Sequence, residues 1–480
     1  MFKLNSLKYF HLAALLTIFF CAVGQTVYAQ TGKRPIIIIP GITGSQLVNS
    51  ETGEKVWFTF SHAETDDLRL PMSPNLAKHR DKLVATDIIR EIKLPSIIPD
   101  IQIYGKALES LKAKGYTEAT WDDPKATDVF YVFAYDWRRD NVESAQQLIR
   151  RIEAVKTKLN RPDLKFNILA HSMGGLIARY AAMYGAADLP PNGRTPIPTW
   201  AGAKDISRIL LFGTPNEGSF GAFTALIKGY TIGGRNLPFV NDLTKDDVFT
   251  IPSLYELLPQ RGTGRFLDEN LHPLNVDIYR PETWIKYGWG AISNSNFLSR
   301  LKDAAKIKGI KPVKGPKLKT IDDKILAETT YAQVRSYLAV VLNRAQRFQQ
   351  ALDAKTNKSP IETLIYGSNC EDTLDAVILV KSERRNGWRT ITRPDEYKTS
   401  AGRKISGKEV KEAIYVPGDG RVPQHSLLAS SALKNSGGKI IKASYSPAEP
   451  LFFCEPHESL LSNQEIEDNF LVTLLKEMLR

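Results

Sequence analysis

Runs of hydrophobic residues alternate with helical patterns along the first half of the chain. Short, continuous apolar runs predict strands that are buried on both faces, as in parallel sheets. Apolar positions spaced three and four apart predict amphipathic helices between them. The predicted strands cover residues 36–39, 128–135, 166–170 and 206–212, and the predicted helices cover 103–115, 142–159 and 176–184. This alternation indicates an α/β fold, with a mostly parallel sheet covered by helices on both faces.

The alternation stops after residue 217. Residues 218–360 contain Gly- and Pro-rich pieces, a lysine-rich tract and a long helical pattern at 325–354. The later predicted elements are strands at 362–366 and 451–454 and a helix at 466–478. We therefore expect a core formed by residues 30–217 and 361–480, interrupted by a cap at 218–360.

The N-terminal segment is typical of a secretory signal peptide, residues 1–29. Lys3 and Lys8 precede an apolar run at 12–24, and a small residue, Ala29, marks the expected cleavage site. The alternative is an uncleaved membrane anchor. However, the 13 apolar residues reach only about 20 Å as a helix, less than the ~30 Å hydrocarbon layer. We expect a secreted or periplasmic protein.

The composition agrees with a globular protein, and the net charge indicates which kind of partner it binds. With 42% hydrophobic and 24% charged residues, the chain is neither collagen nor coiled coil nor disordered. The formal net charge is +12, and loss of the two signal lysines leaves 62 basic against 52 acidic residues, or +10. A basic protein favours anionic partners, and export favours a lipid surface over nucleic acid. Residues 302–319 carry seven lysines, which suit either anionic headgroups or a solvated loop.

A candidate nucleophile lies between a predicted strand and a predicted helix. The segment Ala170–Gly175 (AHSMGG) has the small-x-Ser-x-Gly pattern of a nucleophile elbow. Small neighbours are needed because the serine adopts a strained backbone conformation, and Ala170 replaces the usual first glycine. Ser172 is the predicted nucleophile, and the amide of Met173 at the helix N-terminus is a predicted oxyanion donor. We expect His171 to point away from the serine and to pack or cap.

A nucleophilic serine needs a basic histidine and an acid that orients it. After a nucleophile elbow, the acid precedes the histidine along the chain. Asp419 lies between two glycines at the tip of a loop, and His457 follows the last predicted strand. His425 lies only six residues from Asp419, too few to include a strand, and His272 precedes the acid. The predicted triad is therefore Ser172, Asp419 and His457.

The loop after the first strand is expected to supply the second oxyanion donor. We predict the amide of Thr43 in the segment Pro40–Ser45, with its neighbours as alternatives. This chemistry requires neither a metal ion nor a cofactor. Two cysteines remain after signal removal, Cys370 and Cys454. In an oxidising compartment they form either a disulfide or a pair of buried thiols.

Six segments, in order, resemble the lecithin:cholesterol acyltransferase family, which includes phospholipid:diacylglycerol acyltransferases and the lysosomal phospholipase. The segments are Ile39–Gly41 with Gly44–Leu47, Tyr135–Arg138, Ala170–Gly175, Gly213–Pro215, Ser253–Pro259 and Gly418–Gly420. Tyr-Asp-Trp-Arg and Leu-Leu-Pro are the more specific ones, because many lipases share the elbow. The resemblance implies an α/β-hydrolase core with Ser172, Asp419 and His457 as its triad. It also implies an oxyanion amide at position 43, a cap over the site and acyl-ester lipid substrates.

The chain departs from the vertebrate members of that family, whose lid segment is closed by a disulfide. It has no cysteine between residues 22 and 369. A Cys370–Cys454 bridge would instead tie the acid-bearing region to the strand before His457. The Arg- and Lys-rich block at 381–411 is predicted to be an inserted hairpin.

Two functions remain open on the sequence. One is a serine-dependent lipid O-acyltransferase or acyl-ester hydrolase, working through an acyl-enzyme on phospholipid-like esters at a membrane or lipid surface. The other is a secreted general carboxylesterase or lipase without transferase activity. The triad is the same in both, so the difference depends on whether the cap excludes water and admits a bulky alcohol.

Overall fold

The structure is a computed structural model that describes residues 32–59, 68–92, 101–231, 243–260, 265–293, 297, 331–354, 359–382, 387–429 and 450–475. The predicted signal peptide and the lysine-rich segment 302–319 lie outside the described residues. In these ranges, we find no helix with both the length and the apolar character needed to cross a membrane.

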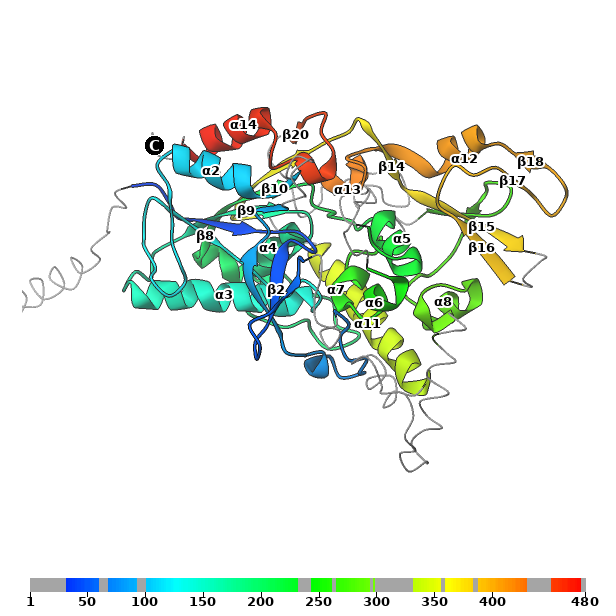
Figure 1. The fold of residues 1–480 in the computed structure, drawn as a ribbon, viewed down its shortest axis with the longest axis horizontal. Helices are drawn as coiled ribbons and strands as arrows, with labels where there is room; N and C mark the ends of the chain where they lie inside the picture. Colours follow the sequence, from blue (N-terminus) through cyan, green and yellow to red (C-terminus); the bar gives the residue numbers. More distant parts are fainter. Residues whose placement is uncertain are drawn as a thin grey trace, which may run out of the picture.

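A seven-stranded sheet forms the centre of the molecule (Figure 1), in the order β20-β13-β10-β9-β1-β8-β7. All of its strand pairs are parallel. Its strands are β1 (Ile36–Ile39), β7 (Thr117–Glu118), β8 (Val129–Val132), β9 (Phe166–His171), β10 (Ile206–Phe212), β13 (Glu362–Gly367) and β20 (Leu451–Phe452). The central strands β1 and β9 are buried along their whole length, because helices cover both faces. The sequence analysis missed only β7, a two-residue strand without an apolar run.

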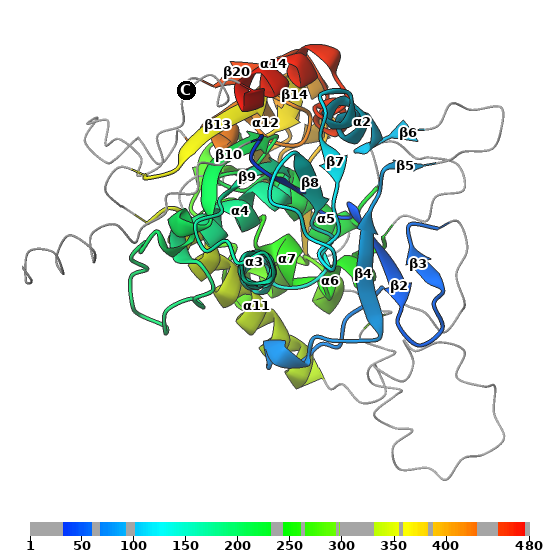
Figure 2. The same cartoon turned by 90° about the vertical axis from the view of Figure 1, so that its left-hand side faces the viewer.

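Helices cover both faces of this sheet (Figures 1 and 2). On one face lie α2 (Gly105–Ala113) and α14 (Gln464–Leu475), which share a hydrophobic cluster with β1 and β10. On the other face lie α3 (Asn141–Lys158) and α4 (Met173–Tyr184). The predicted parallel α/β architecture is confirmed.

The predicted cap region contributes short helices and one long helix. They are α5 (Phe220–Lys228), α6 (Lys245–Phe249), α7 (Pro252–Tyr255), α8 (Pro281–Tyr287) and α11 (Tyr331–Leu352). Arg344 of α11 donates to the Asp140 carboxylate at 2.7 Å and to that of Asp188 at 2.6 Å. Asp140 also caps the N-terminus of α3, so this ion pair joins the long helix to the core.

A second sheet combines two distant parts of the chain and lies beside α8, away from the central sheet (Figure 1). Its strands are β11 (Arg265–Leu267), β12 (Pro273–Leu274), β15 (Ala376–Ser382) and β16 (Gly387–Ile391). β11 and β12 come from the predicted cap, whereas β15 and β16 come from the second part of the predicted core. The antiparallel pair β15–β16 forms a hairpin at the start of the basic block 381–411. In space, the cap region therefore includes residues beyond 360.

The remaining strands and α-helices are short. They are β2 (Ser45–Asn49), β3 (Lys55–Trp57), β4 (Leu83–Ile88), β5 (Glu91–Ile92), β6 (Ile101–Gln102), β14 (Glu371–Leu374), β17 (Tyr397–Lys398), β18 (Lys404–Ile405), β19 (Tyr415–Gly418), α12 (Gly407–Ile414) and α13 (Gln424–Leu428).

The Tyr135–Arg138 motif links loops that are distant in sequence. The indole Nε1 of Trp137 donates to the carbonyl of Ser45 at 3.2 Å. The carbonyl of Trp137 accepts a hydrogen bond of 2.5 Å from the Ser253 hydroxyl. This motif is therefore attached both to the loop after β1 and to the Ser253–Pro259 motif of the cap.

Arg138 is the buried cation of the same motif. Its side chain has no exposed surface. It donates to the carboxylate of Asp81 at 2.6 and 2.8 Å and to that of Asp136 at 2.8 and 2.9 Å. Two carboxylates on one guanidinium satisfy the charge that burial would otherwise penalise.

We predict that Arg138→Gln destabilises the fold by about 3 kcal/mol or more, because it leaves two largely buried carboxylates without a cation. Urea unfolding followed by fluorescence measures the change. Arg150→Gln is the control, since Arg150 is exposed on α3 and its replacement should change stability by less than about 0.5 kcal/mol. Equal stability of the two variants would contradict this role of Arg138.

Candidate active site

Ser172 lies at a sharp turn between β9 and α4. Its backbone has φ 52° and ψ −124°, an unusual conformation for a residue with a side chain. The two glycines that follow are required by packing. A Cβ at Gly174 would lie 2.5 Å from the carbonyl oxygen of Pro40, and one at Gly175 would lie 2.0 Å from Thr214 Oγ1. The AHSMGG pattern is thus explained by close contacts around the turn.

The structure brings the three predicted triad residues together. His457 Nε2 lies 3.0 Å from Ser172 Oγ, and His457 Nδ1 lies 2.8 Å from Asp419 Oδ2. The backbone N–H of His457 also donates to the carbonyl of Asp419 at 2.9 Å. Ser172 and His457 each keep 7% of their surface exposed, and Asp419 keeps 1%. This is the geometry of a serine nucleophile, a base and an orienting acid.

The second carboxylate oxygen of Asp419 is held by the backbone. Oδ1 accepts hydrogen bonds from the amides of Arg421 at 2.9 Å and Val422 at 2.6 Å. The loop is anchored from the other side by Thr373 of β14, whose hydroxyl accepts the N–H of Gly420 at 2.8 Å. Burial lowers the pKa of His457, but the Asp419 carboxylate more than offsets it, so that pKa lies above its ordinary value of 6.5.

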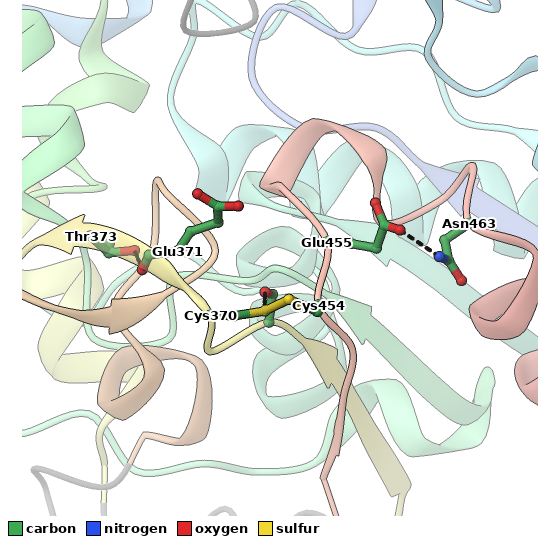
Figure 3. Close-up of a disulfide and its surroundings, with 7 residues drawn as sticks. Cys370, Glu371, Thr373, Cys454, Glu455 and Asn463 are labelled. Atoms are coloured by element: carbon green, nitrogen blue, oxygen red, sulfur yellow. Dashed lines mark hydrogen bonds between the residues drawn. A yellow bond between two sulfur atoms is a disulfide. The ribbon is translucent and has the colours of Figure 1, made fainter.

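A disulfide connects the acid and base segments (Figure 3). Cys370 precedes β14, which pairs with β19, and Cys454 lies three residues before His457. The Cα atoms of the two cysteines are 5.6 Å apart. Beyond the bridge, Glu455 accepts a hydrogen bond of 2.7 Å from Asn463. The structure therefore forms the disulfide that the sequence left as one of two alternatives.

The loop after β1, residues 40–45, faces Ser172 and is here called the oxyanion loop. Two of its amides are engaged, since the N–H of Gly41 donates to the Tyr104 hydroxyl at 2.8 Å and that of Gly44 donates to the carbonyl of Gly41 at 3.1 Å. Among the described residues, the amides of Ile42 and Thr43 have no hydrogen-bond partner. They are therefore free to bind an oxyanion.

Thr43 is held in a left-handed conformation, with φ 61°. The indole of Trp57 fixes it by donating to its carbonyl at 2.8 Å. Met173 opens α4, where first-turn amides have no partner within the helix. Of the two predicted oxyanion donors, Thr43 lines the same pocket as Ser172, and Met173 directly follows Ser172 in the sequence.

His171 connects the oxyanion loop to the base. Its Nδ1 accepts from the Tyr104 hydroxyl at 3.0 Å, and its Nε2 lies 3.2 Å from the carbonyl of His457. A carbonyl accepts, so the proton of His171 is on Nε2. Burial and the adjacent His457 lower the pKa of His171 to about 3, which keeps the ring neutral. Gly41, Tyr104, His171 and the backbone of His457 thus form one hydrogen-bonded series.

The other histidines considered from the sequence lie outside the triad. His425 lies 2.6 Å from Asp375 and 3.2 Å from Glu217, and these two carboxylates raise its pKa to about 9 against the lowering effect of burial. His272 is largely exposed beside Asp268. Among the described residues, no cluster of His, Cys, Asp and Glu side chains has the arrangement of a metal site.

A pocket opens beside Ser172 and is mainly apolar. Trp57 and Phe58 line it from the end of β3, and Leu254 and Leu257 line it from the Ser253–Pro259 motif. Its other lining residues are Gly41, Ile42, Thr43, Gly44, Ile89, Ile92, Ile103, Tyr104, His171, Ser172, Pro215, Ser219, Gly221, Ala222, Tyr230, Arg421, Val422, His457 and Glu458. The sequence analysis missed Tyr104 and Trp57 as site residues, because each reaches the site only by tertiary folding. It also missed Glu458, although that residue directly follows His457. Arg421 had a local signal, since it lies two residues after Asp419.

The sequence model described as lecithin:cholesterol acyltransferase matches residues 84–443, three quarters of the chain. The chain belongs to the lecithin:cholesterol acyltransferase family. No curated protein sequence matches it. The chain is thus an acyl-ester hydrolase or acyltransferase, as the resemblance in its motifs predicted.

One solved structure has a similar fold, and two others are less similar. A crystal structure of a Tle4–Tli4 complex is similar at a TM-score of 0.52, with 14% identity, over 93% of this chain and 99% of that one. EstA from Clostridium botulinum matches at a TM-score of 0.32 and 11% identity, over 93% of this chain and 88% of its own. The phospholipase PlaB from Legionella pneumophila matches at 0.22 and 14%, over 55% and 45%. The predicted α/β-hydrolase fold is confirmed.

We predict that Asp419→Asn lowers kcat by about 10⁴-fold, because the imidazole loses its orienting acceptor. A base must be neutral to accept a proton, so kcat/KM of the wild type should fall as pH drops through a midpoint above 6.5. Without the carboxylate, His457 loses the partner that raises its pKa most while burial still lowers that pKa, so this midpoint should move down. Asp375→Asn removes one of the two carboxylates beside His425 and should leave the midpoint unchanged. The same midpoint in both variants would contradict the assignment.

We also predict that Tyr104→Phe lowers kcat/KM by about tenfold, because the oxyanion loop and His171 lose their shared hydroxyl. Tyr131→Phe is a matched control, since the Tyr131 hydroxyl also makes two backbone hydrogen bonds, at 2.6 and 2.8 Å, but with Lys125. Steady-state rates on a short-chain ester and thermal unfolding of both variants separate the effects. Equal losses of rate would show that Tyr104 acts only through stability.

Proposed function

We propose that the protein cleaves the acyl esters of phospholipid-like molecules through an acyl-enzyme on Ser172, and transfers the acyl group to water or to an alcohol. The observation that carries this proposal is the hydrogen-bonded series Ser172–His457–Asp419, which opens into an apolar pocket. Membership of the lecithin:cholesterol acyltransferase family supports the same reaction class.

In the first half-reaction, Ser172 Oγ attacks the ester carbonyl carbon while His457 Nε2 accepts its proton. The amides of Thr43 and Met173 stabilise the oxyanion, and loss of one such donor typically costs about 10²–10³ in rate. The intermediate collapses, the C–O bond to the lysolipid breaks, and the leaving oxygen receives the proton from His457. In the second half-reaction, water or an alcohol attacks the acyl-serine by the same steps.

The apolar lining supports a lipid acyl chain as the group that is bound. Each methylene buried from water contributes about 0.8 kcal/mol, so a long chain gains binding energy that a short acyl group lacks. Leu254 and Leu257 of the Ser253–Pro259 motif line the pocket, which supports a part for this motif in binding the chain. The proposed substrate is therefore an acyl-ester lipid, and the cap at 218–360 is proposed to cover its chain.

We further propose that the protein acts outside the cytoplasm, in contact with a membrane or lipid surface. The signal pattern of residues 1–29 supports export. The Cys370–Cys454 disulfide supports an oxidising compartment, because reducing cytosols keep such pairs as thiols. The positive net charge favours anionic lipid surfaces.

The test is to incubate the purified mature protein with phosphatidylcholine vesicles, with and without a sterol or a long-chain alcohol. Products are identified by mass spectrometry. We expect release of fatty acid in water, and a new acyl ester formed at its expense when the acceptor alcohol is present. Fatty acid alone would identify a phospholipase and contradict transfer.

Ser172→Ala is the control for this test and should lose every product. A fluorophosphonate probe should label the wild type and not the variant, independently of the lipid. Labelling without any lipid product, but with turnover of short-chain esters, would contradict the lipid proposal and identify a general carboxylesterase.

A further inference from the structure

The pocket beside Ser172 holds one pair of opposite charges. Apart from its histidines, the described lining residues that carry charge are Arg421 and Glu458. Arg421 Nε donates to Glu458 Oε1 at 2.9 Å, and their side chains are 27% and 33% exposed. An ion pair in an apolar pocket is costly to desolvate and adds little stability. Its position therefore calls for a role in binding.

This ion pair lies at the reacting end of the pocket. Glu458 follows the base His457 directly in the sequence. The guanidinium of Arg421 lies 5.6 Å from the ring centre of Tyr230, and Tyr230 interacts with the side chain of Thr43 in the oxyanion loop. Both charges are thus close to the groups that would hold the ester carbonyl.

Among the described residues, not all N–H groups of Arg421 have an acceptor. Its Nη2 donates to the carbonyl of Thr231 at 3.3 Å, and Nε is used by Glu458. Among the described residues, Nη1 has no hydrogen-bond partner. A guanidinium presents its N–H groups as a planar fork that matches two oxygens of a phosphate.

We propose that Arg421 and Glu458 form a subsite for the zwitterionic headgroup of a glycerophospholipid, with the phosphodiester at Arg421 and the ammonium group at Glu458. This proposal rests on the proposed function. In a glycerophospholipid, the phosphate and the ester carbonyl are separated by only a few bonds of the glycerol. A lipid whose carbonyl occupies the oxyanion site therefore places its phosphate near these residues.

Glu458 sets the preference among phospholipids. A phosphate that approaches Arg421 also meets the carboxylate of Glu458, which repels it. The positive amine of phosphatidylethanolamine or phosphatidylcholine offsets that repulsion, whereas phosphatidylglycerol offers no positive group. The subsite therefore favours zwitterionic over anionic headgroups, and it gives no advantage to diacylglycerol, which lacks a phosphate.

The test uses short-chain dihexanoyl lipids kept monomeric, so that surface charge does not affect binding. The values of kcat/KM for phosphatidylcholine, phosphatidylglycerol and diacylglycerol are measured in the wild type and in each variant. Arg421→Gln should lower the phosphatidylcholine-to-diacylglycerol ratio by about tenfold or more, because a charge-assisted hydrogen bond to the phosphate is lost. Arg421→Lys should retain part of that ratio. Glu458→Gln should shift the phosphatidylglycerol-to-phosphatidylcholine ratio upward by about tenfold.

Ratios within one variant separate recognition from changes in the base or in folding. Arg403→Gln breaks an ion pair outside the pocket, with Glu409 at 3.1 Å, and should leave both ratios unchanged. If Arg421→Gln fails to fold, as judged by loss of fluorophosphonate labelling, Arg421→Lys and Glu458→Gln still decide the question.

Unchanged ratios in an enzyme that cleaves these lipids would overturn the headgroup subsite while leaving the proposed function intact. Equal loss of rate on all three substrates, in both Arg421→Lys and Glu458→Gln, would lead to the same conclusion. Absence of Ser172-dependent cleavage of every lipid, diacylglycerol included, would overturn the proposed function as well.

Discussion

The close approach of the oxyanion loop to the first turn of α4 constrains the whole site. A Cβ at Gly41 would lie 2.9 Å from the Cβ of Ser172, and one at Gly174 would lie 2.5 Å from the carbonyl oxygen of Pro40. At this distance, the free amides of the oxyanion loop and the hydroxyl of Ser172 can contact the same substrate carbonyl group. Only a parallel sheet that places β1 beside β9 brings these two turns to the same edge.

The base reaches this point from the β20 edge of the central sheet, and the acid comes from the separate β14–β19 pair. Asp419 follows β19 and His457 follows β20, so neither is positioned by the strands that carry the nucleophile. Their segments are joined by the disulfide, by the pairing of β14 with β19 and by the backbone hydrogen bond from His457 to Asp419. His171 then connects the base to the oxyanion loop through Tyr104. The proposed catalytic groups are thus linked by hydrogen bonds from several sides, which limits their motion before substrate binds.

The cap region shares one hydrophobic cluster with the core and is also attached to this framework by polar contacts. Ser253 bonds to the carbonyl of Trp137, and Arg344 pairs with the N-cap of α3. These contacts give a physical reason for the Tyr-Asp-Trp-Arg and Leu-Leu-Pro motifs, because both motifs lie where the cap meets the core. They also bring Leu254 and Leu257 to the pocket, so the cap contributes directly to the surface that a substrate contacts.

The sequence by itself determined the features that depend on neighbouring residues. Continuous apolar runs marked β1, β9 and β10, because strands buried on both faces need apolar side chains at every position. The elbow pattern marked Ser172, because the strained turn admits only small residues around it. The order of acid and histidine marked Asp419 and His457, and the structure brings both to that serine.

Only the tertiary structure decided what depends on contacts between distant segments. No local sequence pattern marks Tyr104. Its role depends on the hydrogen bonds of its hydroxyl with Gly41 and His171, which lie on other segments of the chain. The second sheet joins β11 to β15, although 108 residues lie between Leu267 and Ala376 at their near ends. Arg421 and Glu458 face one pocket because two loops from different strands converge there. Local patterns follow from the conformation of a few residues, whereas these contacts follow from how whole elements pack.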